Sequence, residues 1–248
     1  MKLIHANWDT KTLGITCYEI ILEEKDNLQQ LLDVENDLSL RMKNYPYFIV
    51  VKTPVNQSGL LFGLPKQGYI LVETAFKMIL NKKNYFRPKI VERFDQYLTI
   101  QEVTLIEGKQ SVYQKIKLGM FCTDRISLSP YFSNSHASQR YVNWIETVTA
   151  NGGKLFEVFL KEQPVGFFTI ERIDRDNVKG ILAGVYVTTR EMGLGLVLQA
   201  KEREICWREN YNKFHLVVSS NNLQAVRSNI KLGCEITELN YVYTKFIN

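Results

Sequence analysis

The sequence lacks several features that would assign a protein class directly. No apolar run reaches the roughly 18–20 residues that a membrane-spanning helix needs. The opening MKLIHANWDT has no apolar core of a secretory signal, so we expect a cytoplasmic protein. The four cysteines stand far apart with no C-x-x-C pair, and the three histidines lack metal-ligand spacing. We therefore expect reduced structural thiols and no metal.

Charge is spread along the chain without blocks of one sign. The 31 basic and 26 acidic residues leave a net charge of +5. Nucleic-acid-binding surfaces cluster their Lys and Arg, so no nucleic-acid partner is expected. A mild positive bias suits a small polyanionic ligand, but charge alone favours an ordinary solvated surface.

The charged stretch 81–96 separates two better-patterned regions. We expect an N-terminal α/β half-domain over 1–96 and a second domain over 97–248. In the second, apolar alternation and helical spacing predict strands at 97–104, 154–163, 164–174, 179–187 and 214–218, and helices at 139–148, 194–205 and 222–232. Leu223, Val226 and Ile230 are expected to face inward, with Gly233 ending that last helix. The chain is expected to close with a hairpin or a bent strand.

Two segments have parallel patterns. NQSGLLFGLPKQGYILVETAFKMIL (56–80) and NNLQAVRSNIKLGCEITELNYVYTKF (221–246) both run through Asn, an apolar helix, Lys-x-Gly and an alternating strand. One interpretation is a degenerate internal repeat. The other is that any helix–Gly–strand unit has this pattern.

A short turn at Arg190-Glu191-Met192-Gly193-Leu194-Gly195 interrupts a strand pattern and precedes a helix. The first amides of a helix have no partner within the helix and lie at the positive end of its dipole. Glycines let an anion approach that backbone closely. The chain has no Walker G-x-x-x-x-G-K-[ST] loop and no complete G-x-G-x-x-G fingerprint. The remaining pattern is [Q/R]-x-x-G-x-[G/A], and we expect it to bind a pyrophosphate.

Two motifs together resemble the acetyl-CoA-binding core of the GCN5-related N-acetyltransferases over residues 180–246. One is this turn with the strand before it, and the other is Asn222-x-x-Ala225 after the strand HLVVSS. The early Trp8-Asp9 and Gly14-Ile15, with SPYF and RYVNWIE before the core, are more loosely similar to two-domain members such as the TDP-fucosamine acetyltransferases. The resemblance implies an α/β (α+β) fold with a mixed, splayed central sheet. If the two parallel segments are a repeat, the N-terminal half-domain is a degenerate copy of that fold.

The resemblance also implies acetyl-CoA as cosubstrate, with its pantetheine arm between two splayed strands. The residues expected at this cofactor are Val185, Tyr186, Val187, Arg190, Glu191, Met192, Gly193, Leu194, Gly195, Asn222 and Asn229. The reaction would be direct attack of an amine on the thioester, helped by a general base and an amide donor for the oxyanion.

The catalytic groups are less well defined. Glu171 is a candidate base, with Glu157 as an alternative, although strand glutamates are more often salt-bridge partners. Many relatives place an acidic tyrosine where this chain has Asn229, which has no acidic proton but could hydrogen-bond the sulfur. Tyr241 is a substitute acid on sequence proximity alone. A CoA-binding module without chemistry is therefore the main alternative function.

The irregular segment before the core is expected to border the acceptor. Asp124, Arg125, Tyr131 and His136 are its candidate contacts, Arg125 for a phosphate and an aromatic for a base. Ordinary loop chemistry explains each of these residues singly. The acceptor is expected to be a small-molecule primary amine, a nucleotide-linked amino sugar being one candidate, with protein and antibiotic amines as alternatives. The oligomeric state stays open, a homodimer included.

Overall fold

The computed structural model describes residues 1–43 and 45–248, with the side chain of Glu191 outside the described part. Its strands are β1 (Lys2–His5), β2 (Thr16–Ile21), β3 (Tyr47–Pro54), β4 (Ile70–Asn81), β5 (Leu98–Glu102), β6 (Lys154–Leu160), β7 (Gln163–Arg172), β8 (Asn177–Val185), β9 (Lys213–Ser219) and β10 (Glu235–Ile247). Its α-helices are α1 (Asn7–Leu13), α2 (Leu28–Met42), α3 (Ser58–Lys66), α4 (Lys89–Phe94), α5 (Ile106–Lys117), α6 (Asn134–Ala150), α7 (Gly195–Arg208) and α8 (Leu223–Lys231). Short 3₁₀ helices are η1 (Lys82–Asn84), η2 (Asp95–Tyr97) and η3 (Val187–Met192).

These strands form one 10-stranded sheet in the order β1-β2-β3-β10-β4-β9-β8-β7-β6-β5. The pairs β2–β3 and β8–β9 are parallel, and the other neighbours are antiparallel. Each parallel pair is joined by a crossover helix, α2 or α7, as parallel neighbours require. The expected α/β (α+β) class with a mixed central sheet is confirmed.

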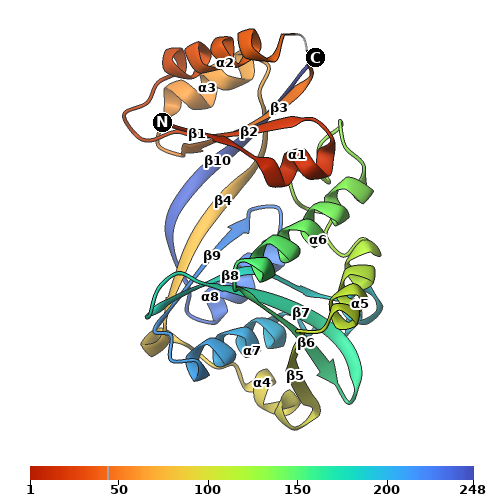
Figure 1. Ribbon diagram of the computed structural model, residues 1–248. Coiled ribbons are helices and arrows are strands. Elements are labelled where there is room, and N and C mark those ends of the chain that lie inside the picture. The colour runs from red at the N-terminus through yellow and green to blue at the C-terminus, as the bar shows by residue number, and fades with distance from the viewer. Residues whose placement is uncertain (44) are drawn as a thin grey trace.

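The two halves of the chain repeat one topology around the centre of the sheet. The unit β2-α2-β3-α3-β4 has the same order as β8-α7-β9-α8-β10, and the similar segments 56–80 and 221–246 fall on α3–β4 and α8–β10. Each unit gives its last strand to the other, because β4 pairs with β9 and β10 pairs with β3. Figure 1 shows β4 and β10 running side by side between the two halves.

Helices cover both faces of the sheet. Side chains alternate along β7, so Phe168 and Ile170 pack with residues of α7 and α8, whereas Phe167 packs with residues of α5 and α6. In the N-terminal half, α2 and α3 supply Leu31 and Leu64 to a separate core over β2, β3 and β10. The crossover of β4 and β10 joins these cores through one sheet. The division at 96/97 stays a prediction.

One predicted detail of the C-terminal segment is wrong, and one open alternative is decided. In α8, Val226 is buried but Leu223 and Ile230 are 53% and 51% exposed, because the helix lies on the sheet through Val226 and the polar Asn229. Of the two expected endings, a hairpin or a bent strand, the chain has the second, because β10 is one long strand with register shifts. Gly233 does follow α8 with φ 94, a conformation that favours glycine.

Candidate active site

The parallel strands β8 and β9 pair over only a short length and then separate. Paired residues run from Asn177 opposite Lys213 to Lys179 opposite His215. Beyond them the edge of β8 that faces β9 has no partner strand within the described residues. A bulge lies at the point of separation, where the β7–β8 register shifts and Gly180 leaves room for the ring of Phe214. This is the splayed sheet expected from the sequence.

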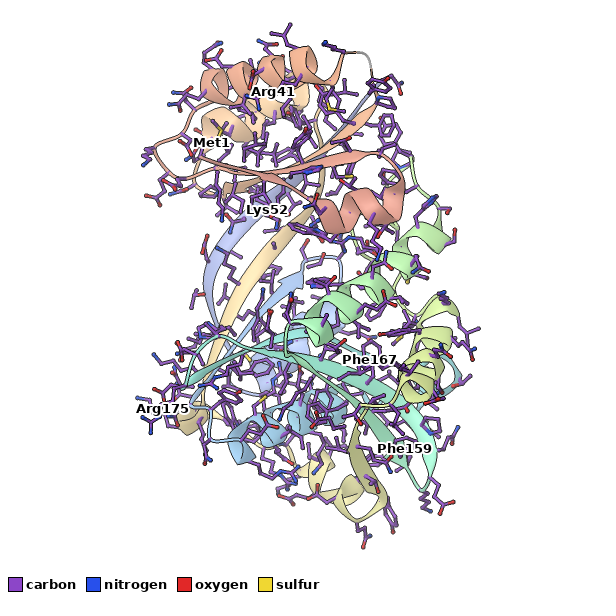
Figure 2. The ribbon with its side chains drawn as sticks, viewed as in Figure 1. Met1, Arg41, Lys52, Phe159, Phe167 and Arg175 are labelled. Atoms are coloured by element: carbon purple, nitrogen blue, oxygen red, sulfur yellow. The ribbon has the colours of Figure 1, made fainter. Side chains whose placement is uncertain are left out.

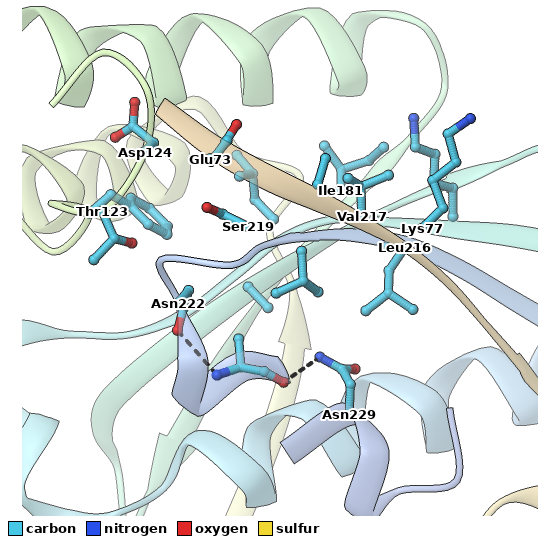
Figure 3. Close-up of a pocket in the computed structure, with 18 of the residues that line it drawn as sticks. Glu73, Lys77, Thr123, Asp124, Ile181, Leu216, Val217, Ser219, Asn222 and Asn229 are labelled. Atoms are coloured by element: carbon cyan, nitrogen blue, oxygen red, sulfur yellow. Dashed lines mark hydrogen bonds between the residues drawn. The ribbon is translucent and has the colours of Figure 1, made fainter. Parts of the chain in front are cut away.

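A cavity of about 370 Å³ occupies the gap between the two strands. Residues 179–183 of β8 and 216–219 of β9 line its sides, and α7 and α8 line one end. The other end is lined by β3, β4, β10, residues 123–125 and α6 (Figure 3). Both halves of the chain therefore contribute to one cavity, because β4 of the N-terminal half pairs with β9 of the C-terminal half.

The turn after β8 leads to an unpaired helix N-terminus. The hydroxyl of Thr189 donates a hydrogen bond to the carbonyl oxygen of Val165 at 3.0 Å and holds η3 against β7. Gly193 has φ 67, which allows the chain to turn into α7. Within the described chain, the amides of Leu196 and Val197 donate to no acceptor. A Cβ on Gly195 would meet nothing within 4 Å, so an anion can approach these amides.

The other residues of the turn differ in how exposed their side chains are to a ligand. Met192 is 48% exposed, whereas Leu194 is 2% exposed and packs in the core. Arg190 is exposed and donates to the carbonyl oxygen of Met120 at 2.9 Å, which directs part of its guanidinium toward the loop after α5. The backbone of Glu191 lies in η3, and its side chain is outside the described part.

The expected backbone contacts at the end of β8 need one correction. The amide of Tyr186 donates to the carbonyl oxygen of Val165 at 2.9 Å, so it is not free for a ligand. The hydroxyl of Tyr186 donates to Glu157 at 2.7 Å, and burial together with that carboxylate raises the pKa of Tyr186. Val185 ends β8 and Val187 begins η3, where it is 38% exposed.

Glu157 is a buried structural partner and not a free base. Its carboxylate accepts hydrogen bonds from Tyr186 and, at 2.9 Å, from Lys115 of α5. It does not line the cavity. Glu171 is half-buried opposite Lys179 in the β7–β8 register, and it too lies outside the cavity lining.

The two asparagines of α8 line the cavity but are engaged with the protein. Asn222 caps the helix, its side chain accepting from the amide of Ala225 at 3.1 Å. Asn229 is 2% exposed, accepts from Arg203 and donates to the carbonyl oxygen of Ala225 at 2.8 Å. The expected hydrogen bond from Asn229 to a thioester sulfur would have to replace these contacts.

Tyr241 lies on the wrong face of the sheet for catalysis. Its neighbours Asn240 and Val242 line the cavity, and alternation along β10 turns Tyr241 toward Tyr243 and the core beneath α2 and α3. Tyr241 is not among the residues that line the cavity, so the geometry gives no support to its predicted role as an acid.

Of the four residues expected at the acceptor, two line the cavity. Asp124 caps the turn that follows it, accepting from the amide of Ile126 at 2.8 Å, and Arg125 is buried beside it. Tyr131 instead stacks on Phe246 with ring centroids 4.9 Å apart. His136 closes the N-terminal capping box of α6 with Ser133, so both of these residues are structural.

Sequence reasoning missed the residues that the N-terminal half contributes. Glu73 of β4 lines the cavity, and within the described chain it has no hydrogen-bond or ion-pair partner. Figure 3 shows Glu73 and Asp124 toward the same end of the cavity and Lys77 away from them. Lys52 of β3 is another lining residue, and Figure 2 shows it on the side of the N-terminal half that faces the C-terminal half. The alternation of Glu73, Ala75 and Lys77 was the available signal, but no pattern indicated which strand β4 would join.

No helix in the described part of the chain has both the length and the apolar character needed to cross a bilayer. Among the same residues, no group of three or more His, Cys, Asp or Glu side chains is arranged to hold a metal ion.

Comparison with known proteins shows similarity in structure only. No protein-family model matches the chain, and no curated protein matches it. A GCN5-related N-acetyltransferase from Sphaerobacter thermophilus gives a TM-score of 0.67 at 11% identity, over 99% of this chain and 75% of that one. One from Kribbella flavida gives 0.60 at 13% identity, over 93% and 81%. A tandem protein of this family from the clavulanic acid biosynthesis pathway gives 0.58 at 10% identity, over 94% and 76%.

These structures share the arrangement over nearly the whole chain, N-terminal half included. The looser resemblance to the TDP-fucosamine acetyltransferases stays a prediction. With its separated parallel strands, its glycine turn and these structural neighbours, the chain has the fold of the GCN5-related N-acetyltransferases.

Proposed function

We propose that the protein transfers an acetyl group from acetyl-CoA to a primary amine. The observation that carries this proposal is the separation of β8 from β9, which opens a cavity beside a helix N-terminus with unpaired amides. The unpaired edge of β8 offers main-chain groups to the amides of a pantetheine arm. The amides of Leu196 and Val197 would hold the pyrophosphate, and open space at Gly195 admits it. The residues present therefore fit the cosubstrate.

Acetyl-CoA supplies an activated thioester, and the chain has to supply a neutral amine beside it. We assign Glu73 as the group that removes the proton from the acceptor's ammonium, because it is the lining carboxylate that no protein donor engages. The amine nitrogen then bonds to the acetyl carbon, the carbon–sulfur bond breaks, and the nitrogen loses its second proton to solvent as the thiolate takes a proton. We assign that proton to water, since Asn229 has no acidic proton and Tyr241 faces away.

Several classes of amine remain candidates for the acceptor. A nucleotide-linked amino sugar remains one candidate, and an antibiotic or protein amine is another. Lys52, Lys77, Arg125, Arg140 and Lys179 all line the cavity. This lining favours an acceptor with negative charge. The engagement of Asn229 in the core is the one feature that favours a CoA-binding module without chemistry.

Thermal-shift and single-turnover measurements separate these functions. Acetyl-CoA should stabilise the protein by about 2.7 kcal/mol at roughly 100 times its Kd, since it binds only the folded form. Labelled acetyl-CoA mixed with an amine panel should then give acetylated product with release of free thiol. Stabilisation without transfer would favour the binding module. The absence of any shift would refute both functions.

A further inference from the structure

Two arginines meet on one buried aspartate at the wall of the cavity. Asp9 of α1 is 0% exposed, and its two carboxylate oxygens accept from Arg140 of α6 and, at 3.1 Å, from Arg125. Burial raises the pKa of Asp9, but the charges of Arg140 and Arg125 outweigh it and hold that pKa below its ordinary value. Arg125 and Arg140 are themselves 8% and 7% exposed, and both line the cavity.

These guanidinium groups have more donors than the protein satisfies. Each carries a planar fork of N–H donors and no acceptor. Among the described residues, the carboxylates within ion-pair distance of them are Asp9 and, 3.7 Å from Arg125, Glu19. Nε of Arg125 is fully buried and has no hydrogen-bond acceptor among the same residues. The aromatic ring of Trp144 lies 5.5 Å from the guanidinium of Arg140 and accepts no such fork. Within the described chain the hydrogen bonds of each guanidinium go to Asp9, and both residues line the cavity, so their remaining N–H donors can bind an anionic ligand there.

The balance of charge agrees with the unpaired donors. Lys52 pairs with Glu19 at 2.8 Å, so within the described chain the ion pairs of Arg125, Arg140 and Lys52 engage two carboxylates, those of Asp9 and Glu19. Burial lowers the pKa of Lys52, and the nearby charge of Arg125 lowers it further despite Glu19. Three cations therefore share two ion-paired carboxylates, and the third nearby carboxylate, that of Glu73, forms an ion pair with none of them within the described chain.

Negative charge lies at the same end of the cavity. Burial lowers the pKa of Arg125, but the carboxylates of Asp9, Glu19 and Glu73 together raise it, so Glu73 is close enough to act on this cluster. The carboxylate of Asp124 is occupied by its own turn, including Ser127 at 2.6 Å. Glu73 is therefore the carboxylate available to an ammonium group, beside guanidinium groups available to an oxyanion.

We propose that the acceptor is a small amine that also carries an oxyanion, a carboxylate or a phosphate. The oxyanion binds Arg125 and Arg140, and this places the amino group toward Glu73. The inference rests on the proposed acetyl transfer and specifies its substrate class.

Matched pairs of amines test this class on the wild-type protein. Glucosamine 6-phosphate is compared with glucosamine, and glutamate with its dimethyl ester, at saturating acetyl-CoA. The charged member of at least one pair should have a KM at least about tenfold lower, because hydrogen bonds between charged groups contribute that much or more. The pair that responds distinguishes phosphate from carboxylate. Transfer to neutral and charged members with equal KM would overturn the inference and leave acetyl transfer standing.

Arg140→Lys provides the matching variant, since it keeps a positive charge beside Asp9 and removes the fork. Arg140→Lys should raise the KM of the charged amine about tenfold and leave the KM of acetyl-CoA and of the neutral amine unchanged. The control is Arg41→Lys on the exposed face of α2, which should change none of these KM values. A rise shared by charged and neutral amines would indicate a structural role and contradict the inference.

A binding measurement keeps the inference testable if no amine is acetylated. Inorganic phosphate should change the fluorescence of Trp144, which lies against Arg140, at matched ionic strength in sodium chloride. The change should disappear in Trp144→Phe and weaken in Arg140→Lys. Absence of any change in the wild-type protein would refute the oxyanion site, whereas failure of transfer alone refutes only the proposed reaction.

Discussion

Arg203 donates a buried hydrogen bond to the side-chain oxygen of Asn229, and so joins α7 to α8 beneath the gap between β8 and β9. Asn229 stands where many enzymes of this fold are expected to carry an acidic tyrosine. In this chain the position stabilises the wall of the cavity, because Asn229 also donates to the backbone of its own helix.

Replacing Asn229 should therefore affect stability first. Asn229→Leu leaves the guanidinium of Arg203 without this acceptor, and an unsatisfied buried donor costs roughly 1–3 kcal/mol. Urea unfolding should show that loss in the free energy of unfolding. Arg227→Ala, exposed on the same helix, should change it by less than about 0.5 kcal/mol. Equal stability of Asn229→Leu and wild type would contradict the structural role.

Glu202 gives the protein a pH-dependent stability. Burial raises the pKa of Glu202 to about 7 from 4.5, although the charge of Arg203 opposes the rise. The folded chain thus holds a proton that the unfolded chain releases, and stability falls as pH rises from about 4.5 to about 7, by up to roughly 3 kcal/mol. Glu202→Gln cannot titrate, so its stability relative to wild type should increase over this range. Unfolding at pH 5, 6 and 7 measures the difference.

Glu107→Gln on the exposed face of α5 is the control for this experiment. Its stability relative to wild type should stay constant with pH. A constant difference for Glu202→Gln as well would show that Glu202 is ionised in the folded protein throughout the range.

The glycine turn should be sensitive to bulk without being important for folding. Gly195→Val places a branched side chain beside the amides of Leu196 and Val197, while a Cβ there meets no protein atom. The melting temperature without ligand should change little, and the stabilisation by acetyl-CoA should be lost. Gly59→Val is a matched control, since Gly59 lies in the first turn of α3 with equally open space. A full acetyl-CoA shift in Gly195→Val would place the pyrophosphate elsewhere.

The strands and helices around the cofactor site could be predicted because their signals are local. Alternation predicted β8, and the change to helical spacing after Gly193 predicted α7. The same local reasoning could not find Glu202 and Arg203, which are 3% and 1% exposed within α7, because charged residues normally indicate the solvent side of a helix. Their burial depends on each other and on Asn229, which comes from a different helix.

The acceptor end of the cavity could not be predicted from the sequence because it depends on the exchange of two strands. β10 lies between β3 and β4, and only this pairing brings β4 beside β9. The sequence similarity of 56–80 and 221–246 indicated a repeat but not the exchange. For the same reason, Asp9 was noticed only as part of a motif, and its contact with Arg140 needed the packing of α1 on α6.

The structure assigns Glu73 as the general base, whereas the sequence indicated Glu171. Glu73→Gln keeps the shape of the side chain but cannot accept a proton, so kcat/KM should fall by about 10²- to 10⁴-fold at neutral pH. The loss should shrink as pH rises toward the pKa of the amine, because a neutral amine needs no base. Glu171→Gln is the matched control, and it should retain wild-type activity because Glu171 lies outside the cavity. Both variants should keep the acetyl-CoA thermal shift. Loss of activity in Glu171→Gln with an active Glu73→Gln would reverse the assignment and show that the acceptor amine enters from the β7 side of the sheet.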